Sequence, residues 1–214
     1  MPSRSSPDRR PTTIPAPRWP RDPLVAMSQK KRGKDPATVT MRRLVKKLTK
    51  AKIPHAVMGG MSVFVHGYRR FTDDVDVLVT RESLQAFKER FVPADYESVA
   101  GRAKRFVDRK NGVTIDFVIT GLYPGFRSEG PITFPDPAEV RELHEDVYFI
   151  NLATLIQLKL AALRPKDYAD VVDLIRANDL DEAFLERLHP TLHHDYLEAL
   201  AHRRREDEYD AKNG

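Results

Sequence analysis

The chain has 214 residues, a formal net charge of +5 and no cysteine. This length suits one domain of ordinary size with a substantial core, and the lack of cysteine excludes disulfides and cysteine-ligated zinc. The sequence has no apolar run approaching the roughly 18 residues of a membrane span. A secretory signal would require an apolar stretch after the N-terminal arginines, and the sequence has none there. Together these features favour a cytoplasmic protein.

The first 36 residues differ in composition from the rest of the chain. Residues 1–36 contain nine basic side chains, three acidic side chains and eight of the 16 prolines, so we predict a disordered, basic tail. The remainder has a net charge of −1, which argues against a strongly cationic nucleic-acid-binding domain. Met27 is a candidate alternative start. The basic run from Lys30 to Lys34 is either a solvated tail or an RNA contact.

The rest of the chain predicts an α/β fold. Asp35 and Pro36 suit the N-cap and first turn of a helix that extends to about Lys52. We expect a core domain over residues 37–150, built on a small mixed sheet with flanking helices, and a helical segment over 151–214. The other expected elements are a helix-compatible piece over 61–67, strands over 74–79, within 96–110, over 113–120 and over 146–150, a loop over 121–137, and helices over 81–91, 152–163, around 167–175 and within 182–209.

Two carboxylates lie on one face of the strand predicted over residues 74–79. Side chains alternate along a strand, so Asp74 and Asp76 point one way while the valines between them face a core. At roughly 4 Å and an effective dielectric of about 20, two such charges repel by on the order of 4 kcal/mol. A hard divalent cation with oxygen ligands is the simplest compensation. Asp116 stands in the middle of another strand, where aspartate is disfavoured; it is either solvent-facing or a third ligand.

A pair of glycines precedes the short helix-compatible piece. Gly59 and Gly60 allow the backbone to approach an anion closely, and the N–H groups at a helix N-terminus favour negative charge. Ser62 adds a hydroxyl nearby. A phosphate cradle beside metal-binding carboxylates is typical of phosphoryl or nucleotidyl transfer.

These residues carry a family resemblance. Gly59-Gly60, thirteen intervening residues and Asp74-Val75-Asp76-Val77 resemble the signature of the DNA polymerase β-like nucleotidyltransferase superfamily. Arg70-x-Thr72-x-Asp74-Val75-Asp76 is similar to the Arg-x-Thr-x-Asp-Ile-Asp form of abortive-infection-type nucleotidyltransferase toxins and their stand-alone relatives. The resemblance covers roughly residues 40–178.

The resemblance implies a metal-dependent enzyme that moves a nucleotide from a nucleoside triphosphate to an acceptor hydroxyl. Asp74, Asp76 and Asp116 would be the catalytic carboxylates and the ligands of two Mg²⁺ ions, or of Mn²⁺. The acceptor would be RNA, often tRNA, a small molecule or a protein, and a toxin-like role would imply an antitoxin partner. The alternative is a non-catalytic nucleotide- or RNA-binding module.

The predicted helix over residues 152–163 carries Lys159 on its apolar stripe. This lysine either extends to water or reaches an anionic site. The segment from Lys159 to Asp170 resembles the Lys-x-x-Ala…Arg…Asp-x-x-Asp segment of the same families, which implies that Lys159 contacts nucleotide phosphates. Arg70 and Thr72 would orient the strand end or bind phosphate, and Arg70 alternatively forms a structural ion pair.

Two groups of histidines are weaker candidates. His189, His193 and His194 have a ligand-like spacing, but the sequence has no H-E-x-x-H motif, so we expect exposed helix histidines. His66 either lines the nucleotide pocket or is a structural histidine.

Overall fold

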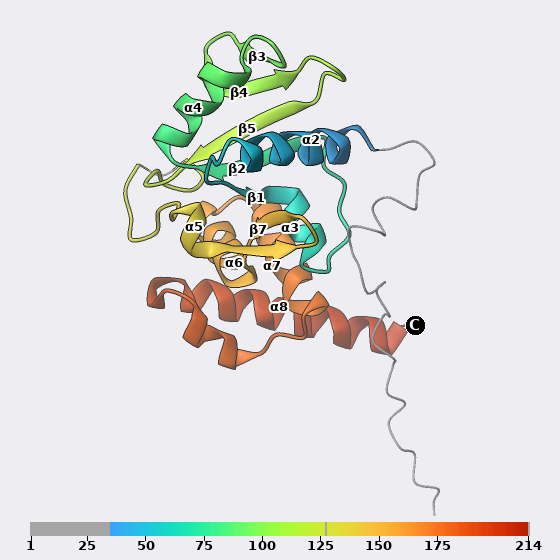
Figure 1. Cartoon of the computed structure of the whole chain (residues 1–214). Coiled ribbons are helices and arrows are strands. Elements are labelled where there is room, and N and C mark those ends of the chain that lie inside the picture. The colour runs from blue at the N-terminus through green and yellow to red at the C-terminus, as the bar shows by residue number, and fades with distance from the viewer. Residues whose placement is uncertain (1–34, 127, 214) are drawn as a thin grey trace, which may run out of the picture.

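A computed structural model describes residues 35–126 and 128–213. Apart from Asp35 and Pro36, the predicted basic tail with Met27 and the run at Lys30–Lys34 therefore lies outside the described residues. The described residues form one mixed seven-stranded sheet in the spatial order β3-β4-β5-β2-β1-β7-β6 (Figure 1). The predicted α/β class and mixed sheet are confirmed.

The strands pair in both directions. Strand β2 runs parallel to β5 and antiparallel to β1, while β1 runs parallel to β7. The outer pairs β3–β4, β4–β5 and β6–β7 are antiparallel. The strands span β1 (Ala56–Met58), β2 (Asp74–Val79), β3 (Tyr96–Val99), β4 (Arg102–Asp108), β5 (Thr114–Ile119), β6 (Arg141–His144) and β7 (Val147–Ile150).

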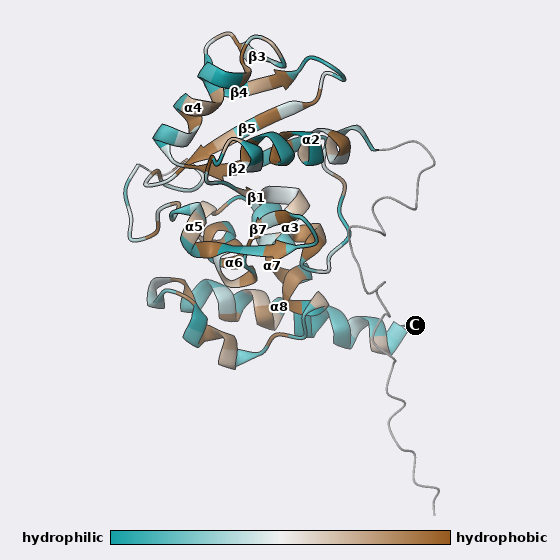
Figure 2. Ribbon diagram, viewed as in Figure 1, coloured by the Kyte–Doolittle hydropathy of each residue, from teal (hydrophilic) through white to brown (hydrophobic). Residues whose placement is uncertain are grey.

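Helices cover both faces of this sheet. Side chains of α2 and α4 pack in one hydrophobic cluster with the sheet, and those of α6, α7 and α8 pack in a second cluster on its other face. Figure 2 shows hydrophobic residues gathered in the strands and the helices against them, whereas the C-terminal half of α8 is hydrophilic. The helical segments are α2 (Pro36–Lys50), α3 (Gly59–Val65), α4 (Arg81–Phe91), α5 (Pro137–Val140), α6 (Leu152–Ala162), α7 (Pro165–Ala177), the 3-10 turns η1 (Glu182–Arg187) and η2 (Pro190–Leu192), and α8 (His193–Asn213).

An aromatic cluster fixes α4 on the sheet. The ring of Phe87 lies 5.2 Å from that of Tyr96, 5.1 Å from that of Phe106 and 4.6 Å from that of Phe117, measured between centroids. These partners come from β3, β4 and β5, so one helical residue joins three strands. Truncation of such a buried ring costs about 3–5 kcal/mol.

Local signals place most element boundaries where they were expected. Asp35 caps α2 by accepting from the backbone N–H of Thr38 at 3.0 Å, and α4 covers the predicted 81–91. The helix expected to reach about Lys52 ends at Lys50. Residues 182–209 were expected to hold one or two helices; they hold two 3-10 turns and most of α8.

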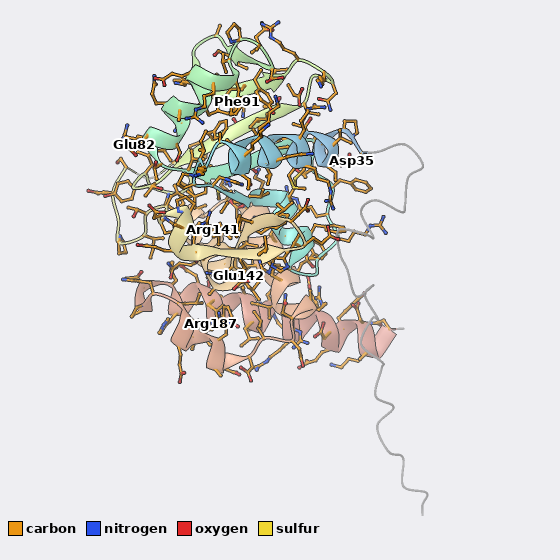
Figure 3. All side chains as sticks on the ribbon, viewed as in Figure 1. Asp35, Glu82, Phe91, Arg141, Glu142 and Arg187 are labelled. Atoms are coloured by element: carbon orange, nitrogen blue, oxygen red, sulfur yellow. The ribbon has the colours of Figure 1, made fainter. Side chains whose placement is uncertain are left out.

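One strand was missed. Strand β6 has the sequence Arg-Glu-Leu-His, with Glu142 and Leu143 exposed, and it lies at the edge of the sheet with charged Arg141 and Glu142 on it (Figure 3). Edge strands carry charges that discourage further pairing, so they lack the alternating apolar pattern that predicts a strand. No helix in the described part of the chain is long and apolar enough to cross a membrane.

Candidate active site

The structure brings the three aspartates together. Asp74 and Asp76 lie on β2, and Asp116 lies on the parallel strand β5, directly opposite Asp76 in the register. The alternating residues Val75 and Val77 are fully buried on the other face of the strand, in the hydrophobic cluster with α2 and α4. The alternation along the strand predicted this. One carboxylate oxygen from each aspartate lies within 4.8 Å of the others. Among the described residues, this is the one acidic or histidine group with the spacing of a metal site.

The cluster is electrostatically unfavourable in the protein alone. Burial, followed by the charges of Asp74 and Asp116, raises the pKa of Asp76 to about 6. Lys159 and Lys166 act in the opposite direction but do not cancel the shift. A bound cation would relieve this repulsion directly.

Gly59 leaves room for the Asp76 carboxylate. It is the first residue of α3, with a left-handed φ of +65°, and a Cβ there would lie 2.0 Å from Asp76 Oδ2. A Cβ on Gly60 would lie 2.9 Å from Thr72 Cβ. The glycine pair therefore lets the β1–α3 junction pack directly against the residues that carry the cluster.

The hydroxyls of Ser62 and Thr72 serve different contacts. The Ser62 side chain is fully buried, and its Oγ donates to the carbonyl oxygen of Val57 at 2.8 Å. The fold thus encloses this hydroxyl and pairs it with the backbone, and its contact with phosphate stays a prediction. Thr72 Oγ1 donates to Asp74 Oδ1 at 2.7 Å, which orients the first carboxylate of the cluster.

Lys159 lies in a buried charge network rather than extending to water. Only 7% of the residue is exposed, and its Nζ is 3.1 Å from Asp167 Oδ1 and 2.5 Å from Asp170 Oδ2. Arg70 pairs with Asp170, which is the structural ion pair considered above, and Arg164 pairs with Asp167. Three cations thus face two carboxylates, which leaves one net positive charge in the network.

The network also sets the ionisation of Asp167. Burial alone would raise its pKa, but the hydrogen bond from Arg164 and the charge of Lys159 outweigh burial and hold the pKa below its ordinary value. Asp167 and Asp170 are therefore buried partners of Lys159, not an ordinary solvated first turn of a helix.

Arg105 is a site residue that the sequence did not indicate. It stands opposite Asp116 in the β4–β5 register, and its Nε and one terminal nitrogen each donate to a carboxylate oxygen of Asp116 at 2.7 Å. Among the described residues, Arg105 is therefore the only basic side chain that forms an ion pair with an aspartate of the cluster. Because the β4–β5 pairing is set by the sheet, spacing along the chain could not reveal it.

A pocket of about 290 Å³ opens beside the cluster. Gly59 and Asp76 are among the residues that line it, and Lys159 and Arg164 contribute positive charge to its wall. His66 does not line this pocket: it is buried, and its Nε2 lies 2.8 Å from the carbonyl oxygen of Ile150. It is a structural histidine.

The remaining histidines do not form a metal site. His189 accepts from the backbone N–H of Thr191 and caps η2, while His194 is exposed at the start of α8.

Comparisons with known proteins found distant similarity to solved structures. No protein-family model and no curated protein matches the chain. The solved structure of JHP933 from Helicobacter pylori is 15% identical, with a TM-score of 0.45, and the match covers 83% of this chain and 95% of that one. An antigenic nucleotidyltransferase-like protein from Paracoccidioides brasiliensis is 16% identical, with a TM-score of 0.42, over 65% of this chain and 73% of that one. We therefore base the functional proposal on the geometry of the site.

Proposed function

We propose that the protein is a metal-dependent nucleotidyltransferase that moves a nucleoside monophosphate from a nucleoside triphosphate to an acceptor hydroxyl. The observation that supports this proposal is the meeting of Asp74, Asp76 and Asp116 on adjacent strands, with carboxylate oxygens within 4.8 Å of one another. Clustered like charges cost stability, and a divalent cation offsets that cost.

The donor set fits Mg²⁺, and Mn²⁺ would suit the same oxygens. Asp74, Asp76 and Asp116 would hold two ions, and the missing Cβ of Gly59 leaves room for the Asp76 carboxylate. Bound there, the ions would neutralise the triphosphate and lower the pKa of the acceptor hydroxyl.

The chain's own groups would orient the nucleotide. The backbone at Gly59 and Gly60 would receive the β- and γ-phosphates, and the excess positive charge of the Lys159 network would attract them. Thr72 would keep Asp74 oriented through its 2.7 Å hydrogen bond. Arg70 would act indirectly, since its guanidinium is paired with Asp170.

In the proposed reaction, the acceptor oxygen forms a bond to the α-phosphorus as the bond from that phosphorus to the bridging oxygen breaks. Pyrophosphate leaves, and the hydroxyl proton passes to a carboxylate of the cluster or to water. The acceptor class, RNA or tRNA, a small molecule or a protein, stays a prediction, as do the toxin-like role and the antitoxin partner.

The test is transfer of label from each α-³²P-labelled nucleoside triphosphate, with Mg²⁺ and total RNA, by the wild type, Asp76→Asn and Asp73→Asn. Asp73 is the matched control because it is an exposed aspartate directly before Asp74 and lies outside the cluster. We expect transfer by the wild type and Asp73→Asn, and a loss of at least about 100-fold in Asp76→Asn. Label in RNA, in protein or in a small molecule would identify the acceptor.

A non-catalytic nucleotide-binding module is the second candidate, and one observation favours it. Both oxygens of Asp116 accept from Arg105, which is a stable way to neutralise a carboxylate without a metal. Nucleotide binding that is independent of Mg²⁺ and unaffected by Asp76→Asn, with no transfer to any acceptor, would select this candidate over the enzyme.

A further inference from the structure

The pocket beside the aspartate cluster has a lining of mixed character. Asp76 belongs to the proposed metal site and Gly59 lies against it, while Lys104, Lys159 and Arg164 supply positive charge. The lining also includes aromatic side chains, among them Tyr123 and Phe126 in the loop that follows β5. Anion-binding groups and an aromatic surface therefore share one pocket.

Phe126 is an unusual member of this lining. Its residue is 97% exposed although it borders the pocket, so the ring stands at the rim with its surface open to a ligand. A single exposed aromatic residue is common on proteins, so exposure alone decides nothing. Two further features indicate that Phe126 meets a ligand: its loop is anchored to the fold, and the pocket is small.

Specific backbone contacts anchor this loop. The N–H of Gly121 donates to the carbonyl oxygen of Phe134, and the N–H of Phe134 donates to that of Leu122, both at 2.8 Å. Gly125 has a φ of +68°, and a Cβ there would lie 2.4 Å from the carbonyl oxygen of Ala162. The residue before Phe126 thus packs its backbone on the last residue of α6, the helix that carries Lys159, and so fixes the loop backbone at the rim.

The pocket volume indicates which part of a ligand would meet this rim. About 290 Å³ is just under the range of about 300–1,000 Å³ typical of ligand pockets. A nucleotide with its phosphates beside Asp76 would therefore extend to the rim with its base. Bases stack on aromatic rings because every base has a π-face.

We propose that Tyr123 and Phe126 form a stacking surface for the base of the bound nucleoside triphosphate. This inference rests on the proposed function, because it places the triphosphate beside Asp76. Since none of the described lining side chains is Asn, Gln, Ser or Thr, stacking rather than amide or small-hydroxyl contacts would select the base. Purines stack over a larger area, so ATP and GTP should bind better than CTP and UTP.

The experiment compares affinities for ATP and for inorganic tripolyphosphate, each with Mg²⁺, in the full chain and in Phe126→Ala. Loss of one stacking contact should weaken ATP binding by about tenfold and leave tripolyphosphate binding unchanged. Phe126→Trp should restore ATP binding, and the purine preference should shrink in Phe126→Ala. Because Phe126 is exposed, its truncation should not unfold the chain.

Phe71→Ala is the matched control, since Phe71 is 84% exposed and does not line the pocket. It should bind ATP like the wild type. Equal ATP affinity in wild type and Phe126→Ala, or an equal loss for ATP and tripolyphosphate, would overturn the stacking surface while leaving the proposed function standing. A wild type that binds neither molecule would overturn both.

Discussion

At the scale of single residues, Asp76 bears the largest electrostatic cost of the candidate site. Its folded-state pKa of about 6 exceeds the ordinary 3.8, so the native protein holds more protons than the unfolded chain between these values. The free energy of unfolding therefore falls as the pH rises from about 4 to above 6. Outside this pH range, Asp76 adds no further pH dependence. The full effect is at most about 3 kcal/mol.

Asp76→Asn should thus be more stable than the wild type at pH 7.5 and nearly equal to it at pH 4, because the amide carries no charge to desolvate. Denaturant unfolding at both pH values, in buffer with a chelator, would measure this. Asp73→Asn, at an exposed position, should show no such pH-dependent difference. If Asp76→Asn raised the free energy of unfolding equally at both pH values, the charge of Asp76 would not be the cause of the gain.

At the scale of elements, the close contact between α3 and β2 decides whether the site can form. Gly59 and Gly101 both have left-handed φ angles, +65° and +70°, but a Cβ at Gly59 meets Asp76 Oδ2 at 2.0 Å, whereas one at Gly101 meets nothing within 4 Å. Alanine in a left-handed conformation costs about 1–2 kcal/mol at either place. At Gly59 the displaced carboxylate should add to that cost.

Gly59→Ala should therefore destabilise the fold more than Gly101→Ala does, and it alone should lower affinity for divalent cations. Unfolding by denaturant and Mn²⁺ titration of the two variants provide the measurements. Equal destabilisation with unchanged Mn²⁺ binding in both would show that the contact with Asp76 has no consequence.

The elements that the sequence predicted well are those with local signals. Strand β2 alternates aspartate and valine, and its valines are buried while its aspartates are only partly so. Strand β6 has no such signal, because none of its four residues is buried. The pairing of Arg105 with Asp116 and the burial of Ser62 against Val57 depend on contacts between elements, which local periodicity cannot predict.

At the scale of the whole molecule, the proposed site joins distant parts of the chain. Two of its carboxylates are on β2 and the third is on β5, while the positive wall of its pocket comes from β4, α6 and the residue that precedes α7. A ligand that binds these parts together in the folded state, and not in the unfolded chain, stabilises the whole fold by mass action.

Mg²⁺ or Mn²⁺ should consequently raise the melting temperature of the protein. At a free concentration of about 100 times Kd, one bound ion adds about 2.7 kcal/mol, which for a domain of this size corresponds to roughly 5–10 °C. For each protein, the melting temperature with the ion is compared with that of the same protein without it, because Asp76→Asn has a different stability before any ion is added. Asp73→Asn should keep the shift and Asp76→Asn should lose most of it, because only the second removes a ligand. A shift of equal size in all three proteins would place the bound ion outside the aspartate cluster.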